Sequence, residues 1–288
     1  YFPEGEYNLH RMADVFDADH LIYKPGVDKL RKLNRLGFKM MGDMNWHNHC
    51  GIYTVPVRTA VRYDIPVVLY GEHGRTNIGG MFNLDDMVEL TARYVREHVC
   101  RGFTWENMAA QNEGLGRKDL DFTIYPNDDE LDELGFRGIY MGFYLLWKPN
   151  DHAEMVQKEY GWKASDQPFE RTYRRISNLD DMHENGVHDY LKYVKFGYGR
   201  CTDHASKDVR DVGMPREEAV ELVRKHDHIK SKDLYRWLEY VGMNEEDFDK
   251  IADSFRDARV WWKDQSDSWC KHNIWDDEET RARKETER

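Results

Sequence analysis

The sequence predicts an α/β layered domain that is followed by a mainly helical region. Up to about residue 80, segments with apolar residues at helical spacing alternate with short apolar runs, an order typical of layered α/β folds. The clearest run, residues 65–71 (IPVVLYG), is short, rich in β-branched residues and ends at a glycine, as strands do. The last third of the chain carries helical patterns only.

The elements expected in the first hundred residues are helices at 8–16, 27–38, 45–63 and 84–101 and strands at 20–23 and 65–70. Gly37 is a stop signal for the second helix, and the third is expected to be largely helical despite Pro56. A wholly apolar strand is typical of a parallel sheet that is covered on both faces. We therefore predict that Ile65–Tyr70 is an interior parallel strand whose carboxyl end opens onto the main cleft.

Beyond residue 103 the pattern changes, and we place the domain division there, with 1–103 as the α/β part and 104–288 as the rest. Residues 104–135 are acidic and glycine-punctuated, as in an irregular insertion, and 136–147 (FRGIYMGFYLLW) predict one strand or two strand pieces. Helices are expected at 152–160, 214–227, 232–241 and 244–257, before a charged and frayed tail at 276–288.

Composition excludes several classes of function. The net charge of −12 disfavours a general nucleic-acid binder, which needs a basic face. No apolar run reaches the ~18 residues of a membrane span, and no secretory signal is visible. The four cysteines form no close pair in the sequence, so free thiols in a reducing cytoplasm are expected.

The first candidate site follows the predicted strand at 65–70. Residues 71–80 (GEHGRTNIGG) would stand at its carboxyl end, where α/β sheets bind ligands. Gly71, Glu72, His73 and Asn77 are its candidate binding residues. The spacing is not that of a phosphate-binding loop, and an ordinary connection between strand and helix is the alternative.

The second candidate site is the stretch 181–211 (DMHENGVHDYLKYVKFGYGRCTDHASKDVRD), around which the chain is organised. Its histidines, acids, bases and close glycines are typical of a pocket wall for an anionic or sugar-like substrate. A solvated helix and a loop whose charges pair with each other is the alternative. Three nearby arginines, Arg171, Arg174 and Arg175, could hold a phosphate or pair with acids.

A metal site is only weakly indicated. His47, His49 and Cys50 lie within four residues, but this spacing is not that of common zinc sites, which also need a fourth ligand. The alternative is a polar patch beside the substrate pocket.

Residues 41–74, 168–210 and 214–227 together resemble the N-acetyl sugar amidotransferase family, whose members serve lipopolysaccharide O-antigen and pseudaminic-type sugar biosynthesis. The resemblance implies a PP-loop ATPase fold, an adenine-nucleotide α-hydrolase-like parallel sheet, with ATP and Mg²⁺. It also implies adenylation of a sugar N-acetyl oxygen, after which ammonia displaces AMP and leaves an acetamidino group. A glutaminase subunit and a cyclase-like subunit would supply the ammonia. The family's SGGKDS-type loop is absent from these residues, and we expect it to be encoded upstream of Tyr1. The resemblance also implies that activity depends on this loop, so the fragment without it could be inactive.

The resemblance suggests roles for the candidate residues. Gly71, Glu72, His73 and Asn77 would line the nucleotide side of the pocket, and residues 197–208 would close against 71–80. The substrate side would comprise Asn185, His188, Arg200 and Lys207 as binding residues and Asp203, His204 and Asp208 as catalytic residues, with His204 the preferred proton acceptor. A tRNA-thiolation-like enzyme and a non-catalytic sugar-nucleotide-binding or assembly subunit are the alternative functions.

Overall fold

The computed structural model describes residues 1–72, 89–177 and 182–288, and its chain divides into two compact units. The first unit combines Tyr1–His20 with Asn150–Arg288, and the second comprises Leu21–Pro149. The division expected after residue 103 lies inside the second unit, and the functional boundary it stands for stays a prediction.

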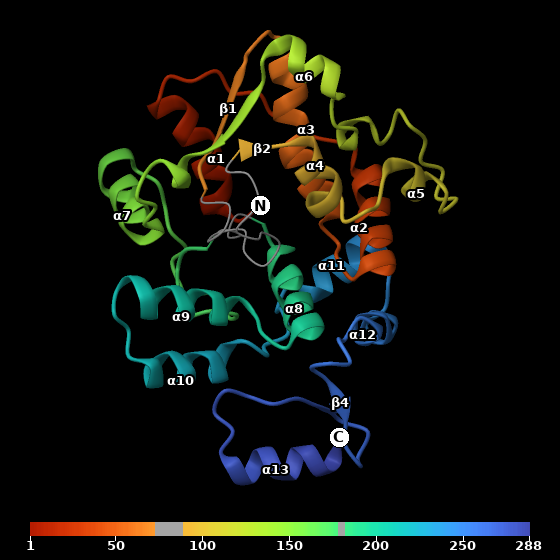
Figure 1. Ribbon diagram of the computed structural model, residues 1–288, viewed down its shortest axis with the longest axis vertical. Helices are drawn as coiled ribbons and strands as arrows, with labels where there is room; N and C mark the ends of the chain where they lie inside the picture. Colours follow the sequence, from red (N-terminus) through yellow and green to blue (C-terminus); the bar gives the residue numbers. More distant parts are fainter. Residues whose placement is uncertain (73–88, 178–181) are drawn as a thin grey trace. The chain divides into compact units, whose positions relative to one another are not determined.

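The first unit is almost entirely helical within its described residues (Figure 1). Its elements are α1 (Pro3–Val15), α7 (Pro149–Tyr160), α8 (Asn185–Phe196), α9 (Arg200–Asp211), α10 (Arg216–His226), α11 (Leu234–Val241), α12 (Glu245–Ser254), β4 (Trp262–Lys263), β5 (Trp269–Cys270) and α13 (Glu278–Glu287).

The second unit holds a small mixed sheet and the helices around it. Its elements are α2 (Val27–Met41), α3 (Trp46–Arg62), β1 (Val67–Tyr70), β2 (Glu89–Leu90), α4 (Ala92–Tyr94), the π-helix η2 (Val95–Val99), α5 (Trp105–Ala109), η3 (Asp121–Thr123), α6 (Asp128–Leu134), β3 (Arg137–Tyr140) and η4 (Met141–Phe143).

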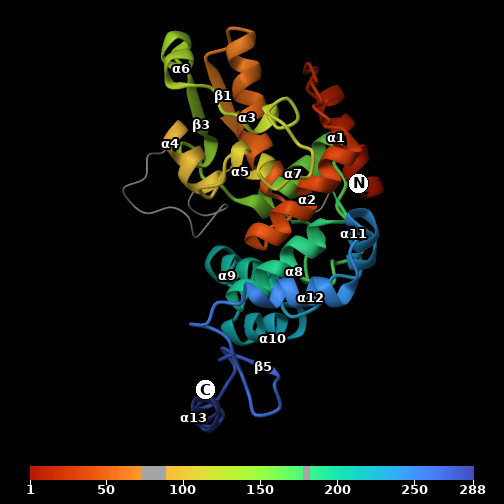
Figure 2. The same ribbon diagram turned by 90° about the vertical axis from the view of Figure 1, so that its right-hand side faces the viewer.

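The three-stranded sheet has the order β1-β3-β2, with β1 parallel and β2 antiparallel to β3. Helix α3 runs alongside β1 and covers one face of the sheet together with η2 (Figure 2). The core on that face includes Tyr53 and Val57 of α3, Tyr70 of β1 and Tyr140 of β3. The fold is therefore mixed α/β as expected, but a PP-loop parallel sheet is not established by the described strands.

The prediction of an interior strand at 65–70 is wrong in one respect. Within the described residues β1 pairs only with β3 and forms an edge of the sheet. Val67 and Leu69 keep 43% and 60% of their surface exposed, whereas Tyr70, on the opposite face, is buried. An apolar run shows that the side chains suit a strand, but it does not show that both faces of the strand are covered.

Two residues that usually interrupt helices lie inside helices here. The second predicted helix does not stop at Gly37, because α2 continues to Met41 and ends at Gly42 in the left-handed conformation (φ 59°). A Cβ on Gly37 would lie 2.5 Å from the carbonyl oxygen of Asp43, so glycine is needed there for close packing. Pro56 lies within α3, as predicted.

Three further expectations need correction. Residues 20–23 form no strand, and Leu21, Ile22 and Tyr23 are largely exposed. In the range 84–101, residues 84–88 lie outside the described residues, and Glu89–Leu90 pairs with β3 as a strand before the helical turns begin. The charged tail forms α13, with Asp277 capping its start and Lys284 bonded to Asp276.

The helices of the last third match their predicted signals. Gly242 ends α11 with a φ of 68°, and the side chain of Asn244 caps α12 by accepting a hydrogen bond from the Asp247 amide at 2.8 Å. Helices α9 and α10 lie side by side around a small core of Cys201, Ala205 and the facing residues of α10 (Figure 1).

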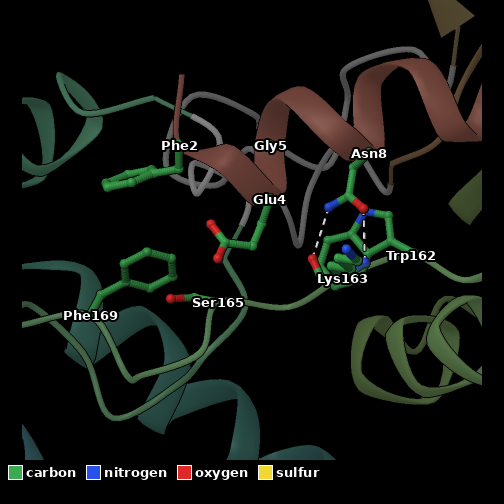
Figure 3. A pocket seen from close by; sticks show the side chains of 8 residues that line it. All are labelled: Phe2, Glu4, Gly5, Asn8, Trp162, Lys163, Ser165 and Phe169. Carbon is green, nitrogen blue, oxygen red and sulfur yellow. Dashed lines mark hydrogen bonds between the residues drawn. The ribbon is translucent and has the colours of Figure 1, made fainter.

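Helix α1 is tied to the segment that follows α7 within the first unit (Figure 3). The Asn8 side chain donates to the Lys163 carbonyl oxygen and accepts from the Lys163 amide, both at 2.8 Å. The Lys163 ammonium lies 3.9 Å from the centre of the Tyr7 ring. Across the described parts of the chain, no helix is both long and apolar enough to span a membrane.

Candidate active site

The central stretch forms two consecutive helices, α8 and α9, rather than a helix and a loop. Gly197 ends α8 with a φ of 76°. Gly199 precedes α9, and a Cβ there would lie 3.0 Å from Asp227. The missing side chain lets the Asp227 carboxylate accept from the amides of Gly199 and Thr202 at 2.8 and 3.0 Å, which caps α9.

Asp189 of α8 lies at the centre of a buried ion-pair network, with 2% of its surface exposed. One carboxylate oxygen accepts from Nε of Arg171. The other accepts from Arg200 of α9, at 2.7 Å from Nη2 and 3.0 Å from Nε. Burial would raise the pKa of Asp189, but Arg200, the neighbouring His188 and Arg171 hold the pKa well below its usual value. Asp189 is therefore ionised and fixes two arginines.

Asp208 of α9 is also buried and fully engaged. It accepts from Arg174 through both Nε and Nη2, from the Tyr173 hydroxyl, and from Asn150 Nδ2 at 3.1 Å. These hydrogen bonds occupy both oxygens of the Asp208 carboxylate. The arrangement favours a role for Asp208 in positioning Arg174 and Tyr173, although its predicted catalytic role stays open.

His204 of α9 is buried, with 2% of its surface exposed. Its Nδ1 shares a hydrogen bond of 2.7 Å with the Thr172 hydroxyl. Burial and the positive charges of Arg174, Arg200 and Lys207 hold the pKa of His204 well below its usual value. The imidazole is therefore neutral near pH 7, and its predicted role as a proton acceptor requires surroundings that are less positive than these.

Asp203 and Lys207 lie one turn apart on α9. Asp203 accepts a hydrogen bond from Lys192 of α8 and lies 3.6 Å from Nη1 of Arg200. Lys207 is partly buried, and within the described residues its ammonium has no hydrogen bond or ion pair. Burial, together with Arg200, Arg174 and Lys192, lowers the pKa of Lys207, and Asp203 opposes this shift.

The remaining candidates of the second stretch lie on α8. Asn185 is buried at its first turn, and Nδ1 of His188 lies 3.6 Å from Asp189. The structure thus places all seven predicted residues of this stretch on two packed helices. Whether they bind or convert a substrate stays a prediction.

The first candidate stretch is only partly within the described residues. His73 and Asn77 lie outside them, as does most of the loop at 71–80. Gly71 is exposed directly after β1, and Glu72 is partly buried, which raises the pKa of its carboxyl. Within the described chain Oε2 of Glu72 is buried without a hydrogen-bond partner. The expected closure of residues 197–208 against this loop stays a prediction.

The histidine–cysteine stretch lies at the start of α3. His47 is fully buried, and this burial, with His49 nearby, lowers its pKa to about 4. His49 lies 3.6 Å from the carboxylate of Asp43, and Sγ of Cys50 lies 3.8 Å from Sγ of Cys100. Nowhere in the described residues do three His, Cys, Asp or Glu side chains group as metal ligands would. A metal-binding role for His47, His49 and Cys50 stays a prediction that these contacts do not support.

Two cavities lie elsewhere in the described structure. The cavity between α1 and residues 162–169 measures about 20 Å³, which holds about one water molecule (Figure 3). A depression of about 460 Å³ lies beside α6, and its lining includes Asp128, Asp132 and Thr91 as well as apolar side chains. Its two carboxylates would repel an anionic substrate.

The sequence indicated some members of the network and missed others. Arg171 and Arg174 were noted for phosphate binding or pairing with acids, and they pair with Asp189 and Asp208. Arg175 points elsewhere, donating to the Ser165 carbonyl oxygen at 2.5 Å. Asn150, Thr172 and Asp227 were missed, because each reaches the site from another segment and carries no local motif.

The candidate site thus lies in a helical unit and is built around a buried network of arginine–aspartate ion pairs. Residues 168–275 match a protein family described as LPS biosynthesis protein WbpG-like, C-terminal domain. The matched range contains α8 to α12 and the candidate residues from Asn185 to Asp208. The match supports a role in lipopolysaccharide biosynthesis. No curated protein matches the chain.

Proposed function

We propose that the protein is an ATP-dependent amidotransferase of surface polysaccharide biosynthesis. It would convert the N-acetyl group of a nucleotide sugar into an acetamidino group, with ammonia from a glutaminase subunit and a cyclase-like subunit. The proposal rests on the overlap between the range matched by the family and the buried ion-pair network. The matched range, residues 168–275, holds the largest part of the buried ion-pair network and every candidate residue on α8 and α9.

The reaction would proceed in two steps. The amide oxygen attacks the α-phosphorus of ATP and releases pyrophosphate, and ammonia then adds to the amide carbon while AMP leaves. Fixed cations favour both steps, because negative charge develops on the phosphates and on the departing oxygen. Arg171 and Arg200 are held by Asp189, and Arg174 by Asp208, so these guanidinium groups are positioned before the substrate arrives.

Mg²⁺ would assist ATP in such a reaction, but the described residues do not fit a site for it. They contain no group of three metal-binding side chains, and the oxygens of Asp189 and Asp208 already accept hydrogen bonds from arginines. We therefore assign no step to the metal ion.

His204 would take the proton that ammonia loses when it adds to the amide carbon. If Nδ1 donates its proton to Thr172, the lone pair of Nε2 is left to accept. The positive charges that depress the pKa of His204 would be partly offset by an anionic substrate. Substrate binding would thereby bring the pKa of His204 closer to the operating pH.

Calorimetric titration of the protein with ATP and with a UDP-N-acetyl sugar tests this function. An amidotransferase binds both ligands, because both take part in the first step. A non-catalytic sugar-nucleotide-binding or assembly subunit binds only the sugar nucleotide, and that result would contradict the proposal. Uridine, which carries no phosphate, and ADP-ribose serve as controls for specificity.

A further inference from the structure

The ion-pair network on α8 and α9 carries more positive than negative charge. Its carboxylates are Asp189, Asp203 and Asp208, and its cationic side chains are Arg171, Arg174, Lys192, Arg200 and Lys207. His204, which is neutral in this environment, adds no charge. This local excess of positive charge contrasts with the net charge of −12 of the whole chain. Grouped like charges repel one another, and a bound anion would relieve that repulsion.

Four of the five cations already have a carboxylate partner. Arg171 and Arg200 pair with Asp189, Arg174 pairs with Asp208, and Lys192 pairs with Asp203. The Lys192 ammonium also lies 4.7 Å from the centre of the Tyr198 ring. These contacts hold the four side chains in place, so their positive charges have fixed positions.

Lys207 is the exception among the described residues. It is partly buried and has no carboxylate partner, and the charged groups that act on it are three cations and Asp203. Burying an ammonium without a partner is costly, and the lowered pKa of Lys207 reflects that cost. A side chain kept in such surroundings is better explained by a ligand than by folding.

The spacing along α9 places these groups together. Arg200, Asp203 and Lys207 are three and four residues apart, so they share one face of the helix. Lys192 reaches the same face from α8 by bonding to Asp203. Lysine binds phosphate as a point charge, and a positioned arginine adds directed donors.

We propose that Lys207, flanked by Arg200 and Lys192, binds the diphosphate group of a nucleotide. The anion site is argued from the ion pairs and the burial of these residues, whereas the assignment of the diphosphate to a sugar nucleotide or to ATP rests on the proposed function. Binding would place negative charge beside His204 as well, which connects the site to the chemistry proposed above.

The test is calorimetric titration of the full chain with inorganic pyrophosphate. We compare the unchanged protein with Lys207→Met, which removes the charge and keeps the length, and with Lys207→Arg, which restores the charge. Lys225→Met is the matched control, because Lys225 is an exposed lysine at the end of the neighbouring helix α10. Thermal unfolding is measured for every variant.

We expect Lys207→Met to weaken pyrophosphate binding by ~10-fold or more, because a charge-assisted hydrogen bond to the anion is lost. Lys207→Arg should restore most of the affinity, and Lys225→Met should bind as the unchanged protein does. The melting temperature of Lys207→Met should stay equal or rise, because no internal partner is lost. A lower melting temperature would show a structural role for Lys207 and overturn the inference.

Competition then identifies the source of the diphosphate. Displacement of pyrophosphate by UDP assigns the site to the sugar nucleotide, and displacement by ATP but not by UDP assigns it to ATP. Either result confirms a diphosphate site, even where no amidine is formed. Absence of pyrophosphate binding to the unchanged protein, or equal binding by Lys207→Met, would overturn the inference.

Discussion

His204 shows how its surroundings decide what a side chain can do. An ordinary histidine titrates near neutral pH, which makes it a natural candidate for proton transfer. Here burial and three nearby cations keep the imidazole neutral, and Thr172 fixes its orientation. Its proposed role as a proton acceptor would therefore require an anion beside it, a condition that the sequence alone could not indicate.

Replacing His204 by alanine tests its proposed role as the proton acceptor. We expect His204→Ala to lower the rate of amidine formation by ~10²-fold or more, because general-base assistance is lost. Binding of the UDP-N-acetyl sugar should change little. Rates come from product mass spectrometry, and affinity comes from calorimetry.

Two outcomes of the His204→Ala experiment would contradict the proposed role of His204. A variant with an unchanged rate would exclude His204 as the base. A variant that loses only affinity would make His204 a substrate-binding residue, and Asp203 would be the next candidate, since Asp208 is engaged by Arg174, Tyr173 and Asn150.

Candidates that are close in sequence could be predicted, and partners from distant segments could not. Arg200, Asp203, His204, Lys207 and Asp208 come together because they follow one another on α9. Thr172, Asn150 and Asp227 join them only through tertiary packing. A single sequence carries no signal for such pairs, since each partner looks ordinary in its own segment.

Helix signals were more reliable than strand signals in this chain. Caps and stops act within one turn, so Asn244 and Gly242 mark their helices correctly. Strand patterns depend on what covers each face. The strand character of β1 and its parallel orientation were predicted correctly, whereas its pairing with β3 was not predicted and its interior position was wrong within the described residues. The run at 20–23 is also largely apolar, yet it forms no strand.

A lysine at position 69 distinguishes an exposed edge strand from a buried interior strand. Because Leu69 is 60% exposed, we expect Leu69→Lys to change the free energy of unfolding by only about 0.5 kcal/mol. Leu33→Lys in the same unit is the matched control, because Leu33 is fully buried and an unpaired buried ammonium should prevent stable folding. Urea denaturation measures both. If Leu69→Lys unfolds the protein as Leu33→Lys does, both faces of β1 are covered.

The two compact units do not follow the order of the chain, and the functional boundary expected after residue 103 stays a prediction. The first unit joins the start of the chain to its second half, with Asn8 and Lys163 bonded across 155 residues. A pattern read in order along the chain cannot indicate such a return. The mixed α/β class could be predicted from the order of elements, whereas a PP-loop fold rests on the family resemblance.

The central claim is that this protein forms acetamidino groups on nucleotide sugars. The most direct measurement is mass spectrometry of the products after incubation with ATP, Mg²⁺, ammonium and a panel of UDP-N-acetylhexosamines. We predict one sugar nucleotide whose mass falls by the difference between an oxygen atom and an NH group, in an amount equal to the AMP released. Binding of ATP and of the sugar nucleotide without any product of that mass, in the presence of ammonium, would contradict the claim.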